Sequence, residues 1–323
     1  MTKAIRIEEF GGPEVLQWVD VAVGEPGPGE VRVRHTASGL NFIDTYHRSG
    51  LYPLPLPSGL GTEAAGIVEA VGTGVREVKP GDRVCYVHRP PDAYSEARLL
   101  PATSLVKVPR AVSDEQAAGM MLKGLTAWYL LKKSYRVQRG DTILFYAAAG
   151  GVGLIACQWA AHLGARVIGV VSTPEKADLA RAHGCDEVIF AEQDVSKEVR
   201  ALTGGEGVPV VYDSVGKDTF FPSLDSLRTH GVLVSYGNAS GPVAPFALSE
   251  LANRGSLYVC RPSLFDFIST PDDLRAGSQA LFDVVLAGAV KIEVNQSYPL
   301  REAAVAHRDL EARRTTGSTV LVP

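Results

Sequence analysis

A glycine-rich segment at residues 147–153, Ala-Ala-Ala-Gly-Gly-Val-Gly, has the residue types of a phosphate-binding turn. It follows an apolar run at 142–146 and precedes a small-residue helical pattern at 152–163, which is the setting that a dinucleotide-binding turn requires. The glycines permit a tight turn close to a pyrophosphate, and the helix start offers unpaired N–H groups. Because Ala148 occupies the first glycine position, a helix cap without a cofactor is the alternative. We expect dinucleotide contacts from Ala149, Gly150, Gly151, Val152 and Gly153.

The end of the next expected strand distinguishes between the two nicotinamide dinucleotides. NAD-specific sites place Asp or Glu there, about twenty residues after the glycines, to bind the ribose 2′-hydroxyl. This chain has Ser172 and Thr173 instead, followed by Lys176. Hydroxyl groups and an ammonium suit a 2′-phosphate, so the sequence predicts NADPH. The alternative is that Lys176 is an ordinary solvated helix residue.

Alternating strands and helices position these residues from 141 onward. This order is typical of a doubly wound parallel sheet. The expected strands are 142–146, 165–171, 186–190, 208–212 and 232–236, and the expected helices are 152–163, 174–183, 195–202 and 218–228.

The N-terminal part has a different pattern of apolar, polar and turn residues. Residues 4–7 and 31–34 alternate apolar and polar side chains, and Gly/Pro-rich turns separate them from further short strands at 66–71 and 82–87. This pattern predicts a β-rich, barrel-like domain. A helix follows at 114–131, with Ser113 and Gln116 as a capping box. After residue 260 come helices at 274–286 and 303–311 and a closing strand at 319–322, too little material for a separate domain, so we expect this tail to pack on the N-terminal domain.

Composition excludes several classes of protein. The chain has 323 residues, 46% hydrophobic and 21% charged, and a net charge of -4 without a cluster of Lys or Arg. It therefore lacks the electrostatic signature of a nucleic-acid or acidic-membrane binder. The charged start and the lack of a long apolar run predict a cytoplasmic protein without a membrane span. The four cysteines form no CxxC pair, so we expect free thiols.

Residues 59–66 (GLGTEAAG), and the spacing from residues 37–41 (ASGLN) to Asp44, resemble the zinc-site motifs of zinc alcohol dehydrogenases. Those enzymes bind a catalytic zinc with Cys, His and Cys. The matching positions here hold Asn41, Thr62 and Lys123, which are not plausible zinc ligands as a set. The four-cysteine structural zinc lobe is also missing, so the sequence predicts no metal.

This combination resembles the zinc-free quinone oxidoreductase branch of the medium-chain dehydrogenases/reductases, which includes zeta-crystallin, and its bacterial NADPH:quinone reductases in particular. The resemblance covers essentially the whole chain. It implies a GroES-like β-rich catalytic domain at 1–123 and 264–323 and a Rossmann domain at 124–263. The matching stretches are 39–53 (GLNFIDTYHRSGLYP), 57–66, 123–126, 147–153, 211–216, 255–264 and 317–318.

The resemblance implies reduction of a small quinone by NADPH. The candidate catalytic residues are Asn41, Tyr46 and Tyr52, whose donors can stabilise charge on a quinone oxygen, although both tyrosines could instead be packing residues. Asp44 is more readily interpreted as a structural anchor or cap than as a catalytic acid. The resemblance also implies a Tyr after the third Rossmann strand, as bacterial relatives often carry, where this chain has Phe190-Ala191, so one polar contact near the adenosine is missing.

Further cofactor contacts are expected near the nicotinamide, at the carboxyl ends of later strands and from arginines beyond them. These candidates are Asn41, Lys123, Thr126, Ser214, Tyr236, Gly237, Arg261 and Arg313.

The apolar segment 256–260 is the expected edge of the Rossmann sheet. It contains no proline or charge, and the resemblance implies a homodimer in which two such edges pair. Two other functions stay open. One is an NADPH-dependent enoyl or 2-alkenal double-bond reductase on the same scaffold, and the other is a structural or RNA-binding role like that of zeta-crystallin relatives. The physiological acceptor, one- or two-electron transfer and assembly beyond a dimer do not follow from the sequence.

Overall fold

The computed structural model describes residues 2–323, whose contacts divide them into two compact units. The first unit comprises residues 2–123, 270–282 and 292–323, and the second comprises 124–269 and 283–291. Residues 264–269 and 283–291 thus belong to the second unit rather than to the first, where the sequence interpretation put them. Two contacts explain this: Phe267 stacks on Tyr129 with ring centroids 4.7 Å apart, and Lys291 exchanges two backbone–side-chain hydrogen bonds with Gln158 at 2.9 and 3.0 Å.

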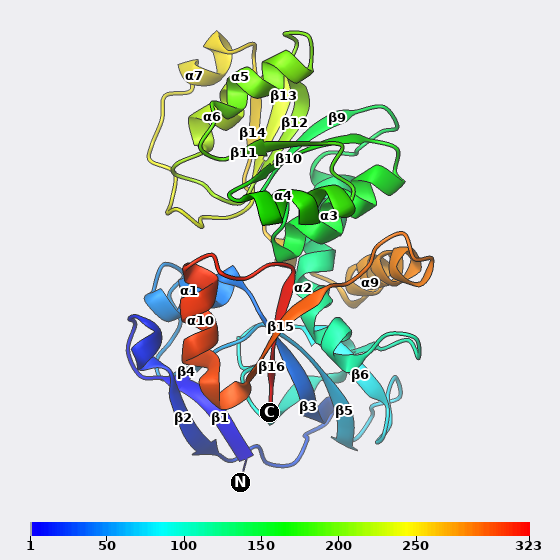
Figure 1. The fold of residues 1–323 in the computed structure, drawn as a ribbon. Coiled ribbons are helices and arrows are strands. Elements are labelled where there is room, and N and C mark those ends of the chain that lie inside the picture. The colour runs from blue at the N-terminus through cyan, green and yellow to red at the C-terminus, as the bar shows by residue number, and fades with distance from the viewer. Residues whose placement is uncertain (1) are drawn as a thin grey trace. The chain divides into compact units, whose positions relative to one another are not determined.

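The first unit is rich in β-strands (Figure 1). One sheet has the order β2-β1-β4, and a seven-stranded sheet has the order β15-β16-β3-β5-β6-β8, with β7 also paired to β3. The strands are β1 (Thr2–Ile7), β2 (Gln17–Val21), β3 (Glu30–Leu40), β4 (Ser58–Gly59), β5 (Glu63–Val71), β6 (Arg83–Val87), β7 (Ala97–Pro101), β8 (Val106–Lys107), β15 (Val294–Pro299) and β16 (Ser318–Val322).

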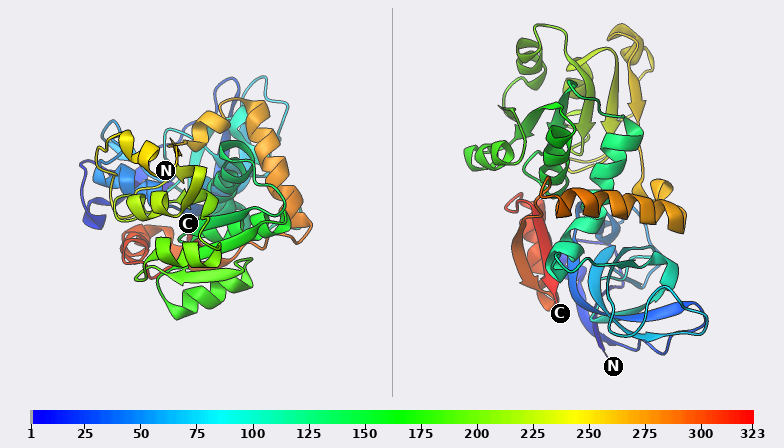
Figure 2. Two further views of the ribbon diagram at one scale, coloured as in Figure 1. Left: turned by 90° about the horizontal axis from the view of Figure 1, so that it is seen from above. Right: turned by 90° about the vertical axis from the view of Figure 1, so that its right-hand side faces the viewer.

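The tail of the chain completes this unit. Strand β16 pairs antiparallel with β3, and Leu321 lies in one apolar core with Ile5, Ile7 and Leu40. The expectation that the tail packs on the N-terminal domain is confirmed for residues 270–282 and 292–323, and β1 and β16, from opposite ends of the chain, belong to the same unit (Figure 2). Helices α1 (Phe42–Ser49) and α10 (Ala303–Glu311) also belong to this unit, and α2 (Asp114–Tyr129) and α9 (Pro271–Leu286) each have residues in both.

The second unit is built on a six-stranded parallel sheet with the order β11-β10-β9-β12-β13-β14. This is the doubly wound strand order of a Rossmann domain. The strands are β9 (Thr142–Tyr146), β10 (Arg166–Val171), β11 (Glu187–Phe190), β12 (Val208–Asp213), β13 (Leu227–Ser235) and β14 (Tyr258–Cys260).

Helices cover this sheet. α3 (Gly151–His162) and α4 (Pro174–Ala182) pack on β9, β10 and β11, whereas α5 (Val195–Leu202) and α6 (Phe220–Asp225) contribute to the apolar core that includes Leu144 and Ile168. Helix α4 begins with Pro174 at its first position, and Gly184 follows its end at a φ of 94°. The remaining short elements are α7 (Ser249–Asn253), α8 (Leu264–Phe267), a π-helical turn (Leu130–Ser134) and the 3₁₀ turns Pro13–Val15, Ala102–Ser104 and Leu300–Glu302.

Two expected elements of this unit are wrong in extent. Helix α6 ends at Asp225, not at 228, because Leu227 already belongs to β13, where it is buried and lies opposite Val208. The edge strand is shorter than 256–260, since Ser256 has a φ of 55° and the strand begins at Tyr258.

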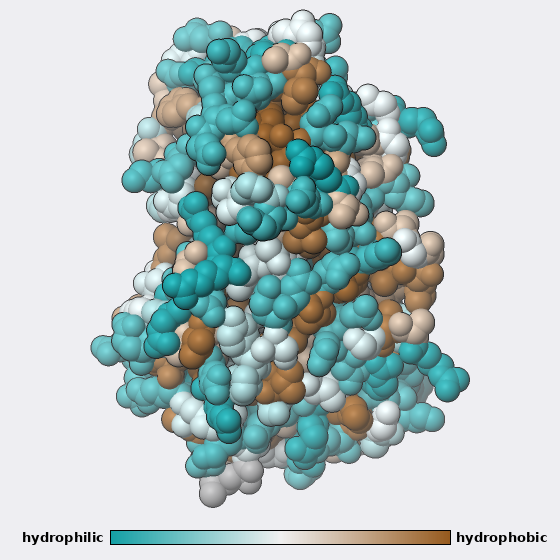
Figure 3. Space-filling model, viewed as in Figure 1, coloured by the Kyte–Doolittle hydropathy of each residue, from teal (hydrophilic) through white to brown (hydrophobic). Residues whose placement is uncertain are grey.

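Hydrophilic residues cover most of the face of the molecule seen in Figure 3, and hydrophobic residues form scattered patches between them. Among residues 2–323, none of the helices has the length and apolar character that crossing a bilayer requires. The four cysteines are free thiols, three of them buried.

Candidate active site

The glycine-rich turn connects β9 to α3 in the second unit. Ala147 has a φ of 53°, and a Cβ on Gly153 would lie 2.3 Å from the Ala147 carbonyl oxygen, so this position requires glycine for the helix to pack against the turn. Helix α3 begins after Gly150, and no side chain caps its first turn. Its first N–H groups are therefore available to an anion such as a pyrophosphate.

The end of β10 brings two of the predicted 2′-phosphate residues together. The Lys176 Nζ donates to the Ser172 Oγ over 3.4 Å. The Thr173 Oγ accepts from the Lys176 backbone N at 3.3 Å and is the N-cap of α4. Thr173 thus has a structural task that the sequence interpretation did not assign, while Ser172 is exposed at the strand end.

Four further candidates lie at the carboxyl ends of β12, β13 and β14. A Cβ on Gly237 would lie 2.3 Å from the Ser214 carbonyl oxygen, so these two turns touch. Arg261 directly follows β14, and its Nη1 donates to the Ser235 carbonyl oxygen at 3.0 Å. Ser214, Tyr236, Gly237 and Arg261 therefore share one edge of the sheet with the glycine-rich turn.

The two remaining candidates for cofactor contacts, Thr126 and Arg313, do not lie at the carboxyl ends of the parallel strands. Thr126 is buried on α2, three residues after Lys123. Arg313 lies in the first unit, in an exposed turn after α10, where its φ is 59°.

Asn41, Glu63 and Lys123 form a buried polar cluster in the first unit. The Asn41 Nδ2 donates to the Glu63 Oε1 at 2.7 Å, and the Lys123 Nζ donates to the same oxygen and to the Leu40 carbonyl oxygen, both at 3.1 Å. The Glu63 side chain is completely buried and that of Lys123 is 7% exposed. The cluster places an ammonium where the resemblance put the third zinc ligand. Glu63 was missed by sequence reasoning, although a glutamate in a strand of small, apolar residues was an available signal.

Asp44 is the centre of a second buried network, which anchors α1. Its carboxyl accepts from the Asn41 backbone N at 2.9 Å, the Tyr94 hydroxyl at 3.0 Å and the Thr62 hydroxyl at 3.1 Å. The bond to Asn41 is one arm of a capping box, so the interpretation of Asp44 as a cap is confirmed. Burial raises the pKa of Asp44 to about 7, against the opposing effect of these hydrogen bonds.

The C-terminal helix α10 extends this network. His307 contacts the Tyr94 hydroxyl at 3.2 Å and the Arg48 Nη1 at 3.1 Å. Arg48 also forms a bidentate ion pair with Glu311 at 2.7 and 3.0 Å. Burial lowers the pKa of His307 to about 3, so its ring is neutral between the two partners. The network ties α1, which carries Tyr46, to the rest of the first unit.

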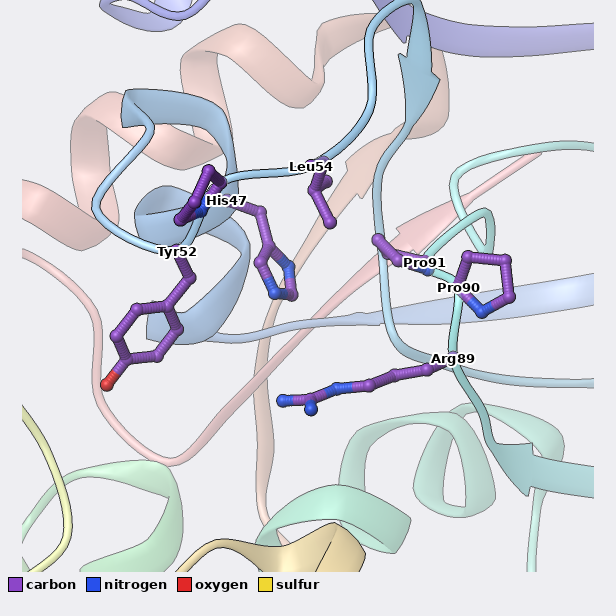
Figure 4. A pocket seen from close by; sticks show the side chains of 7 residues that line it. His47, Tyr52, Leu54, Arg89, Pro90 and Pro91 are labelled. Atoms are coloured by element: carbon purple, nitrogen blue, oxygen red, sulfur yellow. The ribbon is translucent and has the colours of Figure 1, made fainter.

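A pocket of about 360 Å³ opens beside α1 (Figure 4). Tyr52 lines it, as expected, but Tyr46 is not in the lining. Tyr46 supports Tyr52 instead, with an edge-to-face ring contact at 5.3 Å and a backbone bond from the Tyr52 N to the Tyr46 carbonyl oxygen at 3.0 Å. The sequence interpretation missed the other lining residues, which are His47, Pro53, Leu54, Arg89, Pro90 and Pro91. This volume lies in the range of small-molecule sites.

Within residues 2–323, no group of three or more His, Cys, Asp or Glu side chains is arranged to hold a metal ion. The three positions that match the zinc ligands of alcohol dehydrogenases are otherwise engaged. Asn41 and Lys123 bind Glu63, and the Thr62 hydroxyl donates to Asp44. An ammonium and an amide N–H₂ are donors, so this set does not fit a zinc ion.

Comparisons with known proteins agree with this architecture. An alcohol dehydrogenase GroES-like domain matches residues 27–134, and a zinc-binding dehydrogenase domain matches residues 151–272. The chain is 56% identical to a quinone oxidoreductase of Pseudomonas aeruginosa, with both proteins covered completely. It is 50% identical to a 2-haloacrylate reductase of a Burkholderia species, over all of this chain and 99% of the relative.

A solved structure extends the likeness to three dimensions. The crystal structure of Escherichia coli quinone oxidoreductase complexed with NADPH matches 99% of this chain and 100% of that one, with a TM-score of 0.97 and 50% sequence identity. The expected fold class, a GroES-like domain joined to a Rossmann domain, is confirmed by these matches. Identities of 56% and 50% over essentially the full length of both chains show that this chain belongs to the quinone oxidoreductase family of medium-chain dehydrogenases/reductases.

Proposed function

We propose that this protein is an NADPH-dependent reductase of small quinones. The observation that carries the cofactor assignment is the end of β10, where a lysine ammonium and a serine hydroxyl lie within 3.4 Å of each other and residues 170–173 include no Asp or Glu. A 2′-phosphate is a dianion that such donors bind well. The quinone is supported by the names of two relatives, quinone oxidoreductases at 56% and 50% identity over the full length.

The chain's own residues bind and orient, while NADPH, when bound, supplies the hydride. The uncapped first turn of α3 would hold the pyrophosphate, and Ser172 and Lys176 the 2′-phosphate. In the first unit the Tyr52 phenol would donate to the acceptor's carbonyl oxygen, where negative charge develops during reduction. Tyr46 holds Tyr52 in place through its ring contact.

The cofactor assignment is tested by Lys176→Ala. Loss of one charge-assisted contact to the 2′-phosphate should raise the KM for NADPH roughly 10- to 100-fold and leave that for NADH nearly unchanged. Steady-state rates with 1,4-benzoquinone and both cofactors measure this. Lys197→Ala is the matched control, since Lys197 is exposed on α5. An equal effect on both cofactors would refute a 2′-phosphate role.

We further propose that the reaction needs no zinc. The support is chemical: the Lys123 ammonium already pairs with Glu63 at the position in question. Activity should survive prolonged dialysis against a chelator, and elemental analysis of the active protein should find no stoichiometric zinc. One zinc per chain that is required for turnover would overturn this proposal.

An enoyl or 2-alkenal reductase is the second candidate, and it is favoured by the 2-haloacrylate reductase among the relatives. Both reactions add hydride to an electron-poor acceptor, so they can share a scaffold. An NADPH oxidation screen with 1,4-benzoquinone, 2-alkenals and 2-chloroacrylate compares the two directly. Higher kcat/KM for the activated alkenes than for every quinone would replace our first proposal.

RNA binding is the non-enzymatic alternative. A net charge of -4 and scattered basic residues argue against it. Filter binding at several salt concentrations tests RNA binding, and tight binding at physiological salt would support this alternative.

We propose a homodimer formed through the edge of the Rossmann sheet. Strand β14 is the outermost strand in the order given above, and its Tyr258 is 61% exposed. An unprotected apolar edge invites pairing with a second copy. Sedimentation should find a dimer at micromolar concentration, and Tyr258→Pro should weaken it more than Tyr258→Ala. A monomeric unmodified protein would refute the interface.

We also propose a cytoplasmic location. The four free cysteines suit a reducing compartment, as does the use of NADPH. Cell fractionation with a tagged full-length chain tests this, and recovery in an oxidising compartment would refute it.

A further inference from the structure

The pocket beside α1 has a chemical character that quinone reduction alone does not require. Its lining combines the guanidinium of Arg89, the imidazole of His47 and the phenol of Tyr52 with apolar Leu54 and three prolines, and it includes no Asp or Glu. In Figure 4 the Arg89 side chain extends below the His47 ring, and the Tyr52 ring lies to the left of it. A neutral benzoquinone carries no group that needs a guanidinium.

His47 is the second observation. It is 3% exposed, and among residues 2–323 its Nδ1 has no hydrogen-bond partner. A buried polar nitrogen without a partner is costly, so its presence at a pocket points to a ligand atom that completes it. The ring is held in place, with its centroid 6.3 Å from that of Tyr52.

Electrostatics decide which kind of ligand atom fits. Burial and, after it, the charge of Arg89 lower the pKa of His47 to about 4, so the imidazole is neutral at neutral pH. A neutral imidazole can still donate one N–H. The lining therefore offers a positive charge together with neutral donors, which is the complement of an oxyanion such as a carboxylate or sulfonate.

We propose that this pocket binds an anionic substituent of the acceptor, with Arg89 as counter-charge and His47 as donor, while the single O–H of Tyr52 faces the acceptor's carbonyl oxygen. The inference rests on the proposed function and narrows its substrate class to quinones or activated alkenes that carry a carboxylate or sulfonate. Pro53 directly follows Tyr52, and Pro90 and Pro91 directly follow Arg89, so these prolines restrict the lining's backbone and favour a preformed site.

The test compares a matched pair of acceptors, 1,4-benzoquinone and 1,4-benzoquinone-2-carboxylate, with NADPH as donor. The measured quantity is the ratio of kcat/KM for the anionic acceptor to that for the neutral one. Arg89→Gln should lower this ratio roughly tenfold, and Arg89→Glu should lower it further by repulsion. His47→Phe, which keeps a ring but removes the N–H, should lower it roughly threefold. Arg89→Lys, which keeps the charge, should restore most of the ratio.

Arg110→Gln is the control, because Arg110 is exposed and lies outside the lining, and its substitution removes the same charge from the chain. A second measurement does not depend on turnover of the anion: the inhibition constant of benzenesulfonate against 1,4-benzoquinone should rise roughly tenfold in Arg89→Gln and not in Arg110→Gln. The inference would be overturned if Arg89→Gln had the same kcat/KM ratio for the two acceptors, and the same inhibition constant for benzenesulfonate, as the unmodified protein. If NADPH reduced neither acceptor, the proposed function itself would fail, whereas turnover of the neutral quinone with an unchanged ratio would refute only the anion site.

Discussion

The glycine-rich turn of the Rossmann unit (residues 147–153) and the buried polar cluster of the first unit (Asn41, Glu63 and Lys123) obtain their binding groups in different ways. In the glycine-rich turn, the backbone supplies the binding groups: Gly150, Gly151 and Gly153 shape the turn, and no side chain caps the first N–H groups of α3. In the polar cluster, side chains from β5 and α2 meet, with Glu63 and Lys123 60 residues apart in the chain.

This difference has an energetic consequence. A turn made by neighbouring residues asks only for a local conformation, and a substitution there costs the local strain that it introduces. A buried ion pair removes two charges from water, so each partner depends on the other. We therefore expect substitutions in the polar cluster to cost more stability than those in the turn.

The largest effect is expected from Glu63→Gln. It leaves the Lys123 ammonium buried without a counter-charge, which should lower the free energy of unfolding by about 3–5 kcal/mol. Urea denaturation measures this. Glu69→Gln is the matched control on the same strand, because Glu69 pairs with Arg32 at a partly exposed position. It should cost at most about 1 kcal/mol.

A second substitution separates charge from packing in this cluster. Adding Lys123→Met to Glu63→Gln removes the orphaned ammonium and should recover a large part of the lost stability. If the double variant were as unstable as the single one, packing rather than charge would explain the loss, and the contrast between the two regions would fail.

Asp44 gives an intermediate effect that depends on pH. Its carboxyl keeps its proton in the folded protein up to a pKa of about 7, whereas the ordinary value is 3.8. The stability that this proton contributes is complete below about pH 4 and is lost as the pH rises toward 7, by up to about 4 kcal/mol at 1.36 kcal/mol per pKa unit.

The difference in unfolding free energy between the unmodified protein and Asp44→Asn isolates this contribution, because other titrating groups cancel between the two. Denaturation curves from pH 4 to pH 8 should show the unmodified protein losing stability relative to the Asn variant up to about pH 7, and no further change above it. A difference that stays constant across the range would mean that Asp44 is ionised in the fold.

The smallest effect is expected in the glycine-rich turn. Gly153→Ala places a Cβ 2.3 Å from the Ala147 carbonyl oxygen, and the shift of α3 that relieves this should cost about 1–3 kcal/mol. It should also weaken NADPH binding, which fluorescence titration measures. Gly150→Ala, where the nearest atom would be 3.1 Å away, should cost clearly less. A loss equal to that of Glu63→Gln would erase the distinction between the two regions.

The sequence by itself determined what short stretches of chain decide. The Ser113–Gln116 capping box predicted the start of α2, and both of its hydrogen bonds form at 3.1 Å. Pro174 and Gly184 predicted the limits of α4, and the glycines after β9 predicted the turn into α3. Backbone conformation, caps and hydrophobic period are local properties, so residues a few positions apart are enough to reveal them.

Only the tertiary structure decided which distant side chains meet. The sequence showed Asn41 and Lys123 as candidates but not Glu63, the carboxylate that joins them, and it gave no sign that Asp44, Tyr94 and His307 form one network. From the sequence, Tyr46 and Tyr52 were equally good candidates for the pocket. In the structure Tyr52, His47 and Arg89 line the pocket, whereas Tyr46 is outside the lining and contacts the Tyr52 ring. These contacts depend on the pairing of strands such as β3 with β5 and β16, whose register is set by burial across the whole sheet and not by any one segment.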